Sequence, residues 1–241
     1  MSSSQSKDLT HLLPPHANDS VVVVDRPFVT LTYAQTLDGS IATAQRTQVK
    51  ISGDESMAMT HFLRAHHDAI LVGSGTVLAD NPRLNARLPN APSQPRPVIL
   101  DSHLRCPDSA NFLSTASRPD PIIFCLGRHY TEEKASKLAA KGAKVVKIGE
   151  TGDGKLDLVE VLKYLGTQGV RSVMVEGGAT IIEVFLRDRL ADRVIVTIAP
   201  VFLGGLRTLG EPLGHPLVLE NLTYDRLGQD IVVSGYPGKT C

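Results

Sequence analysis

Residues 69–84 read AILVGSGTVLADNPRL, and this stretch decides the fold. It begins with four apolar residues typical of a buried strand, and the turn that follows holds two glycines, a hydroxyl, a carboxylate and an arginine. A second glycine turn, EGGAT at residues 176–180, follows another apolar run. Two such turns in one chain predict a phosphate-bearing ligand held across the ends of a sheet.

Strand-like and helix-like segments alternate outward from this stretch. From residue 71 to residue 199 they follow the βαβ rhythm of a parallel sheet, whereas the C-terminal end has the pattern of antiparallel strands. We therefore predict a mixed α/β fold with a mainly parallel central sheet and helices on both faces. The predicted strands are 28–34 (a central strand), 41–43 (a short return after the turn at 37–40), 69–72, 98–100, 122–125, 144–148, 172–175, 194–199 and a final hairpin of 217–224 with 230–236; the predicted helices are 53–65, 131–141, 156–168 and 180–188.

Composition limits the class of protein. The 241 residues are 42% hydrophobic and carry 25 basic and 25 acidic side chains, so charge gives no reason to expect nucleic acid or an acidic membrane as partner. No apolar run reaches the roughly 20 residues that span a bilayer, and the N-terminal residues MSSSQ lack the basic and apolar regions of a signal peptide. Three scattered cysteines predict a reduced, cytoplasmic protein. We expect a loosely held tail over residues 1–20, with the apolar residues 21–24 laying it onto a single domain over residues 21–241.

The helix at 53–65 has a specific predicted start and face. The sequence SGDE at residues 52–55 fits a capping box, in which a serine hydroxyl and a glutamate bond the free amides of the first turn. Met57, Ala58, Phe62 and Ala65 then fall on one face, which we expect to be buried.

Several candidate site residues have a structural and a functional interpretation. The glycines at 177 and 178 allow either a close-approaching ligand or a tight strand–helix turn, and a full G-x-G-x-x-G motif is absent. Asp80 is a turn residue or a cofactor contact, and Thr76 a helix cap or a cofactor contact. The nearby Arg64, Arg83 and Arg87 are solvated charges or, as a set, a phosphate clamp. Three further residues, His61, His66 and His67, lack the spacing of a metal site, so we expect no metal.

Five motifs in order carry a family resemblance: TLDGSIA at 36–42, ISG at 51–53, LRA at 63–65, DAILVGSGTVLADNPRL at 68–84 and VMVEGGA at 173–179. They resemble the riboflavin-biosynthesis reductases, which have a dihydrofolate-reductase-like fold, and the match runs from about residue 26 to residue 236. The chain is most similar to the stand-alone fungal and archaeal type. Bacterial relatives carry a preceding zinc deaminase domain, whose H-x-E and C-x-x-C ligand motifs are missing here, so we expect no deaminase activity.

The resemblance implies a reaction. It implies NADPH-dependent reduction of the ribosylamino side chain of 2,5-diamino-6-ribosylamino-4(3H)-pyrimidinone 5′-phosphate to the ribitylamino form. It also implies a small-molecule substrate and a homodimer, for which the apolar C-terminal strands could supply the contact. Two alternatives stay open: another dihydrofolate-reductase-like NADPH reductase acting on a pterin-like ring, and a non-catalytic nucleotide-phosphate binding module. The arginine set disfavours the first, and the retained Thr76 and Asp80 disfavour the second.

The resemblance also implies residue roles. Glu176 touches substrate, and Glu176 or Asp38 relays the proton that the substrate nitrogen gains. The remaining substrate contacts are Arg64, Leu84 and Arg87, with the arginines on the 5′-phosphate. The cofactor contacts are Thr76, Asp80, Gly177, Gly178, Ala179, Thr180 and Ile181. For the 2′-phosphate of NADPH the candidate is Arg128, which follows a predicted strand. Bacterial relatives usually carry lysine where this chain has Thr32, to which we assign no role.

Overall fold

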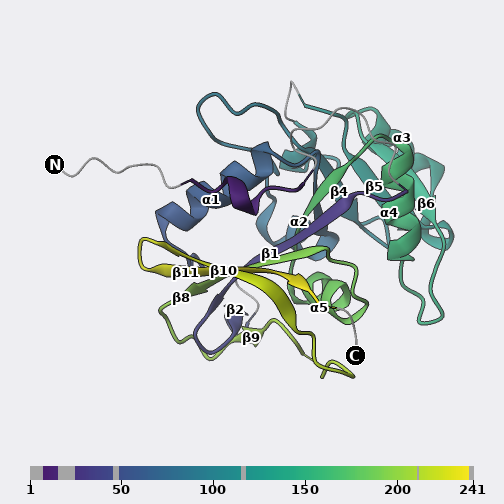
Figure 1. The fold of residues 1–241 in the computed structure, drawn as a ribbon. Coiled ribbons are helices and arrows are strands. Elements are labelled where there is room, and N and C mark those ends of the chain that lie inside the picture. Colours follow the sequence, from purple (N-terminus) through teal and green to yellow (C-terminus); the bar gives the residue numbers. More distant parts are fainter. Residues whose placement is uncertain (1–7, 16–24, 46–48, 115–117, 211, 239–241) are drawn as a thin grey trace.

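The computed structural model describes residues 8–15, 25–45, 49–114, 118–210 and 212–238, and its centre is a nine-stranded sheet with the order β10-β11-β8-β1-β7-β3-β4-β5-β6 (Figure 1). Neighbours are parallel from β8 to β6, and β11 and β10 add an antiparallel edge. The strands are β1 Phe28–Thr36, β3 Ala69–Gly73, β4 Arg96–Leu100, β5 Ile122–Leu126, β6 Lys144–Ile148, β7 Ser172–Glu176, β8 Arg193–Ala199, β10 Leu219–Leu227 and β11 Asp230–Pro237. The predicted central strand and the C-terminal hairpin are confirmed.

Helices cover both faces of the sheet, as predicted. On one face the apolar core includes residues of α4 (Leu158–Thr167) and α5 (Ala179–Arg187). On the other face it includes residues of α1 (Asp54–Ala65), α2 (Ser74–Asp80) and α3 (Glu132–Ala139). The inner strands are buried on both sides, which is why they read as continuous apolar runs in the sequence.

The start of α1 differs from the predicted capping box. Its N-cap residue is Gly53, and no side chain of its own segment caps it. Instead the Asp230 carboxylate, from the start of β11, accepts the Gly53 amide N–H at 2.7 Å and the Ser56 hydroxyl at 2.6 Å. The cap therefore comes from 177 residues away, and it ties α1 to the antiparallel edge of the sheet.

The buried face of α1 also differs from prediction. Ala65 is buried as expected, but Met57 and Phe62 are only half-buried and Ala58 is exposed. The buried apolar side chains are those of Met59, Leu63 and Ala65. In this orientation of α1, His61 is buried and Arg64 is half-buried instead of facing solvent. The Arg64 side chain reaches the end of β7.

The return strand after β1 does not pair with β1. The strand β2 (Ser40–Ala42) instead pairs antiparallel with β9 (Leu206–Arg207) in a separate two-stranded sheet. This small sheet fixes the 200–207 loop beside the end of β1, because Gly205 packs so closely on the Ala42 carbonyl that a Cβ there would lie 2.0 Å from its oxygen.

Part of the predicted loose tail is docked. Over residues 8–15 the chain forms the short helix η1 (Thr10–Leu12), and Leu12 is fully buried against α1 and β8. His11 lies 2.8 Å from Asp225, and Arg193 donates to the Leu13 carbonyl. The remaining predicted tail and the apolar residues 21–24 lie outside the described residues. In the described part of the chain no helix is long and apolar enough to cross a membrane, and Cys106 and Cys125 are buried and not disulfide-bonded.

Candidate functional site

An ion pair joins two of the four predicted substrate residues, Arg64 and Glu176, which lie at the ends of different elements. Glu176 is the last residue of β7, and Arg64 lies in the last turn of α1. The guanidinium binds the carboxylate in a two-pronged geometry, Nε to Oε1 at 2.7 Å and Nη2 to Oε2 at 2.5 Å. The side chains are only 13% and 19% exposed. Burial alone would lower the pKa of Arg64, but the adjacent carboxylate outweighs it and raises that pKa.

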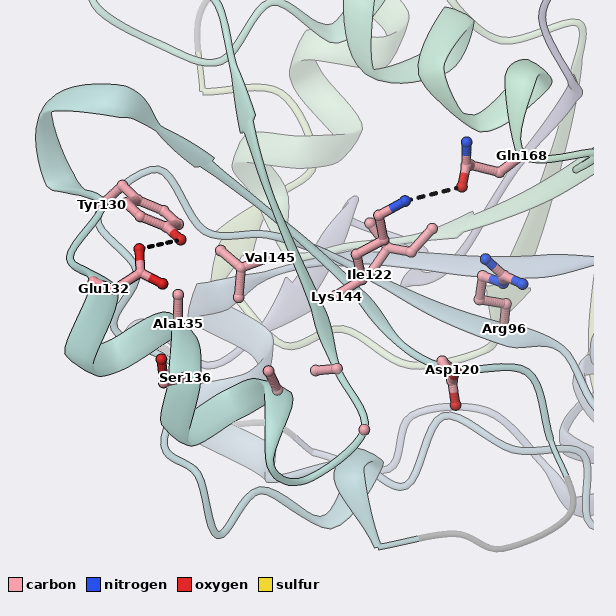
Figure 2. Close-up of a pocket in the computed structure, with 13 residues that line it drawn as sticks. Arg96, Asp120, Ile122, Tyr130, Glu132, Ala135, Ser136, Lys144, Val145 and Gln168 are labelled. Atoms are coloured by element: carbon pink, nitrogen blue, oxygen red, sulfur yellow. Dashed lines mark hydrogen bonds between the residues drawn. The ribbon is translucent and has the colours of Figure 1, made fainter.

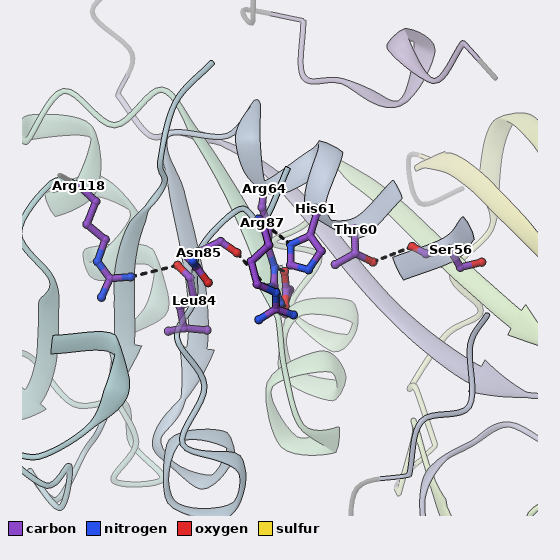
Figure 3. Close-up of polar contacts among 9 residues, drawn as sticks. Ser56, Thr60, His61, Arg64, Leu84, Asn85, Arg87 and Arg118 are labelled. Carbon is purple, nitrogen blue, oxygen red and sulfur yellow. Dashed lines mark hydrogen bonds and ion pairs between the residues drawn. The ribbon is translucent and has the colours of Figure 1, made fainter. Parts of the chain in front are cut away.

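His61 and Arg87 lie beside this pair (Figure 3). His61 precedes Arg64 by three residues on α1, so the two share a helix face. Its Nδ1 accepts the Arg87 amide N–H at 3.3 Å, which requires the neutral ring. Burial, with the charges of Arg64 and Arg87, lowers the pKa of His61 to about 4. The ring is therefore uncharged at neutral pH, and the net positive charge here resides on the arginines.

Thr32 is next to Glu176 in the sheet. The two residues are paired in the parallel register of β1 and β7, so their side chains share the face that α1 covers. Thr32 is buried. The position where bacterial relatives carry lysine is thus adjacent to the Arg64–Glu176 pair.

The two glycine turns meet at the ends of β3 and β7. A Cβ on Gly178 would lie 3.7 Å from the Thr76 hydroxyl oxygen, so Thr76 faces the second turn. Thr76 is not the cap of α2, because that helix begins two residues earlier at Ser74. Gly178 is the N-cap of α5, with no side-chain cap bond. The first-turn amides at Ala179 and Thr180 are therefore available to an anion.

Gly177 and Gly178 play different roles. A Cβ on Gly177 would lie 2.6 Å from the Ile181 Cβ, so this glycine is required by packing. Ile181 also lies 3.0 Å from the Cβ position of Gly73, and its side chain closes the gap between the two turns. Packing therefore requires a glycine at position 177, whereas a Cβ at position 178 would make only an ordinary contact with the Thr76 hydroxyl.

Asp80 and Asp38 differ in environment. Asp80 ends α2, and burial raises the pKa of its carboxyl. The Asp38 carboxylate accepts bonds from the Thr36 and Ser40 hydroxyls and from the amides of Leu203 and Gly204. The Thr36 hydroxyl, with these other donors, holds the pKa of Asp38 well below its usual range. A carboxylate held ionised by four donors is a clamp for the 203–204 loop, and its predicted role in proton relay stays untested.

Leu84 packs in the core. Its side chain is 2% exposed among residues of β3 and β4, and its φ is +50°. A substrate contact here would therefore come from the backbone. Arg118 holds this segment by donating to the Arg83 carbonyl at 2.7 Å and the Leu84 carbonyl at 3.3 Å (Figure 3). Arg83 itself is exposed.

Arg128 lies farther along the sheet. It follows β5 and forms an ion pair with Glu150, and it also donates to the Gly154 carbonyl at 3.0 Å. Its side chain is about half exposed. Its assignment to the 2′-phosphate stays a prediction.

Two other features lie apart from this site. A cavity of about 610 Å³ runs along α3 and the first residues of β5 and β6, and it is lined by none of the predicted site residues (Figure 2).

Over the residues the structure describes, no group of three His, Cys, Asp or Glu side chains could hold a metal ion. His67 is instead a buried structural residue, bonded to the Leu63 carbonyl and the Thr30 hydroxyl.

Comparison with known protein families identifies the family of this chain. The model of the RibD C-terminal domain matches residues 27–233. The chain belongs to the RibD C-terminal domain family. The RibD C-terminal domain here shares 31% identity and a TM-score of 0.76 with the solved riboflavin biosynthesis reductase Rib7 of Saccharomyces cerevisiae, over 95% of this chain and 97% of that one.

Curated relatives of this RibD C-terminal domain fall into two groups. Proteins named 2,5-diamino-6-ribosylamino-4(3H)-pyrimidinone 5′-phosphate reductase include one from Debaryomyces hansenii, 41% identical over 79% of this chain and 82% of the relative. One from Archaeoglobus fulgidus is 35% identical over 75% of this chain and 83% of the relative. The RibD protein of Aquifex aeolicus is 35% identical over 88% of this chain, which spans 58% of that relative's length.

Sequence reasoning missed His61 as a site residue and missed Arg118 entirely. His61 was considered only as a metal ligand, although its spacing of three from Arg64 on a helix was a usable signal. Arg118 donates to the carbonyls of Arg83 and Leu84, which precede it by 35 and 34 positions. No local sequence pattern indicates such a distant contact.

Substitutions at Gly177 and Gly178 test whether this turn contacts the predicted cofactor. Gly178→Ala adds a methyl group at ordinary contact distance from Thr76, so we expect a melting temperature near that of the wild type. We expect NADPH binding to weaken about tenfold or more, because the methyl would stand between the backbone and a closely approaching cofactor. Gly177→Ala is the matched control, and we expect it to lower stability by about 1–3 kcal/mol through its clash with Ile181. Calorimetric titration and thermal melts measure both. Wild-type NADPH affinity in Gly178→Ala would place the cofactor elsewhere.

Proposed function

We propose that this chain is an NADPH-dependent reductase of the riboflavin pathway, acting on the ribosylamino side chain of 2,5-diamino-6-ribosylamino-4(3H)-pyrimidinone 5′-phosphate. The observation that carries the proposal is the Arg64–Glu176 pair, which lies at the end of β7 directly before the Gly177–Gly178 turn and beside Arg87. The fungal and archaeal relatives bearing this reductase name support it. The chain covers most of their length, so the comparison concerns nearly the whole of those proteins.

The chain's residues fit a nicotinamide dinucleotide. The uncapped first turn of α5 and the open side of Gly178 suit a pyrophosphate, and the Thr76 hydroxyl faces the same space. Asp80, Ala179, Thr180 and Ile181 complete the proposed contacts. When bound, NADPH would supply the hydride. The protein's contribution is to align the two reactants and to exclude water between them.

The substrate's phosphate is assigned mainly to Arg87. Arg64 is bound on two of its nitrogens by Glu176, whereas the Arg87 side chain is exposed at the same place. A phosphate monoester favours such a guanidinium. Arg64 then positions Glu176 and contributes to the phosphate only through its remaining donors.

Glu176 is the stronger candidate for handling the proton at the substrate nitrogen. Its carboxylate is oriented by the Arg64 guanidinium at the junction of the cofactor and substrate residues. Asp38, in contrast, already accepts four hydrogen bonds, and its lowered pKa makes it a weak proton donor.

We also infer a cytoplasmic homodimer. Residues on and beside β10 leave large apolar side chains exposed, Tyr224 at 66% and Val218 at 64% among them. The strand β10 is also an edge of the main sheet. Exposed apolar side chains on an edge strand are a liability unless covered, and a two-fold pairing with a second copy would cover them.

Catalysis gives the direct test. Mixing the protein, NADPH and the diaminopyrimidinone phosphate should remove the near-ultraviolet absorbance of NADPH, and Glu176→Gln should lower kcat about 100-fold because it removes a proton-handling group. We expect the NADPH dissociation constant of the variant to stay near the wild-type value. No loss of absorbance with the wild type would overturn the proposed function. Unchanged kcat with weaker NADPH binding would instead make Glu176 a cofactor contact.

Substitutions of Arg87 and Arg64 should have different effects on KM and kcat. Arg87→Ala should raise the substrate KM about tenfold or more with little change in kcat, because it removes a charge-assisted contact to the phosphate. Arg64→Ala should lower kcat as well, because Glu176 loses its orienting partner. Steady-state kinetics with thermal melts as a folding control measure this. Identical effects of the two variants would contradict the division of roles.

Light scattering should give twice the mass of the chain for the wild type. Tyr224→Glu should shift that mass to the monomer, because a carboxylate would be buried at the proposed interface. Val159→Glu, at an apolar side chain on α4 that is 48% exposed, is the control and should leave the dimer intact. A dimer that survives Tyr224→Glu would place the contact elsewhere.

A further inference from the structure

We propose that Arg105 reads the 2′-phosphate of NADPH and so decides the preference for NADPH over NADH. This inference rests on the proposed function, since it concerns the cofactor of that reaction. It assigns to the cofactor site a residue on the loop after β4, a segment in which sequence patterns indicate no candidate.

Arg105 lies next to the first glycine turn. It follows β4 by five residues, and β4 is the parallel neighbour of β3, whose end carries that turn. Its Nη2 donates to the Ser74 hydroxyl oxygen at 3.2 Å. Ser74 is the first residue of α2, two residues before Thr76. The guanidinium is thus in direct contact with the segment that holds the proposed cofactor residues.

A buried carboxylate anchors Arg105 from behind. Asp101 is fully buried, and its Oδ2 accepts the Cys106 amide N–H at 2.7 Å. Its Oδ1 has no hydrogen-bond partner among the described residues and lies 4.0 Å from the Arg105 Nε. This long ion pair involves the Nε of Arg105 and not its Nη1 or Nη2. The Arg105 side chain is 56% exposed. Its Nη2 is engaged by the Ser74 hydroxyl, which leaves Nη1 to bind an anion.

Arg128 is less well suited to the same phosphate. It comes from the end of β5, one strand farther from β3 than β4 is. Its guanidinium already binds the Glu150 carboxylate and the Gly154 carbonyl. A phosphate at Arg128 would have to compete with a carboxylate at contact distance, whereas at Arg105 it would meet a cation whose own counter-charge is 4.0 Å away.

The surroundings of Arg105 also suit the adenosine half of the cofactor. His103, on the same loop, has its ring centroid 4.3 Å from that of His129, which follows β5. Purine bases stack on aromatic surfaces of this kind. Two strand spacings, about 10 Å, separate β4 from β7. The adenosine at β4 and β5 would therefore lie along the same row of strand ends as the reaction centre at Glu176.

The experiment measures NADPH and NADH binding by calorimetric titration of the whole chain. The proteins compared are the wild type, Arg105→Ala, Arg105→Lys and Arg128→Ala. We expect Arg105→Ala to weaken NADPH about tenfold or more and to leave NADH within about twofold, because only NADPH carries the phosphate that a charge-assisted bond would recognise. Arg105→Lys should restore part of the preference, because it keeps the charge but loses the two-pronged geometry.

Adenosine 2′,5′-bisphosphate and adenosine 5′-phosphate provide a second pair of probes that does not depend on nicotinamide. The first should lose affinity in Arg105→Ala and the second should not. Equal losses for NADPH and NADH would mean that Arg105 contacts the pyrophosphate, and would overturn the inference. So would an unchanged preference in Arg105→Ala, or a preference lost only in Arg128→Ala. A wild type that fails to bind NADPH at all would instead overturn the proposed function, which makes the two failures distinguishable.

Discussion

The position of β7 between β1 and β3 is the constraint on which the rest of the site depends. Parallel strands end at the same edge of a sheet, so this insertion brings together the ends of three strands that are far apart in sequence. The turn after β3 and the turn after β7 then become neighbours, with Thr76 facing Gly178. The register also pairs Glu176 with Thr32 of β1. A different strand order would separate the proposed cofactor residues from the proposed substrate residues.

The Arg64–Glu176 pair links this edge to the helix layer. A partly buried ion pair adds little net stability, because desolvation offsets the attraction between the charges, whereas removal of one partner costs about 3–5 kcal/mol by leaving the other uncompensated. Its value here is geometric. The two-pronged contact fixes the orientation of a carboxylate at the end of β7, and α1 in turn is held at its start by Asp230 of β11. The antiparallel edge thus supports the site through one helix.

The sequence predicted what local patterns encode and missed what distant partners supply. Apolar runs such as residues 69–72 and 122–125 located the inner strands, because strands buried on both faces need continuous apolar residues. The cap of α1 was predicted wrongly because SGDE satisfies the local rule, while a carboxylate 177 residues away occupies the position instead. Pairing of β2 with β9 was missed for the same reason. The motifs placed Thr76, Gly178, Glu176 and Arg64 at one edge of the sheet. They did not predict that Arg64 binds Glu176, because this contact depends on the orientation of α1, and the apolar periodicity of α1 predicted the wrong buried face.

The distribution of charge along the strand ends supports the proposal that one edge holds two phosphate-bearing reactants. At the end of β7 the charges of Arg64 and Glu176 cancel and His61 is neutral, so Arg87 is left as the excess cation of that cluster. At the end of β4, Arg105 is only loosely balanced by the buried Asp101. Two cations with weak local compensation thus lie at the same edge as the glycine turns. In the proposed reaction each would fix one reactant through its phosphate, and the two rings would approach each other between these anchors, as a hydride transfer requires.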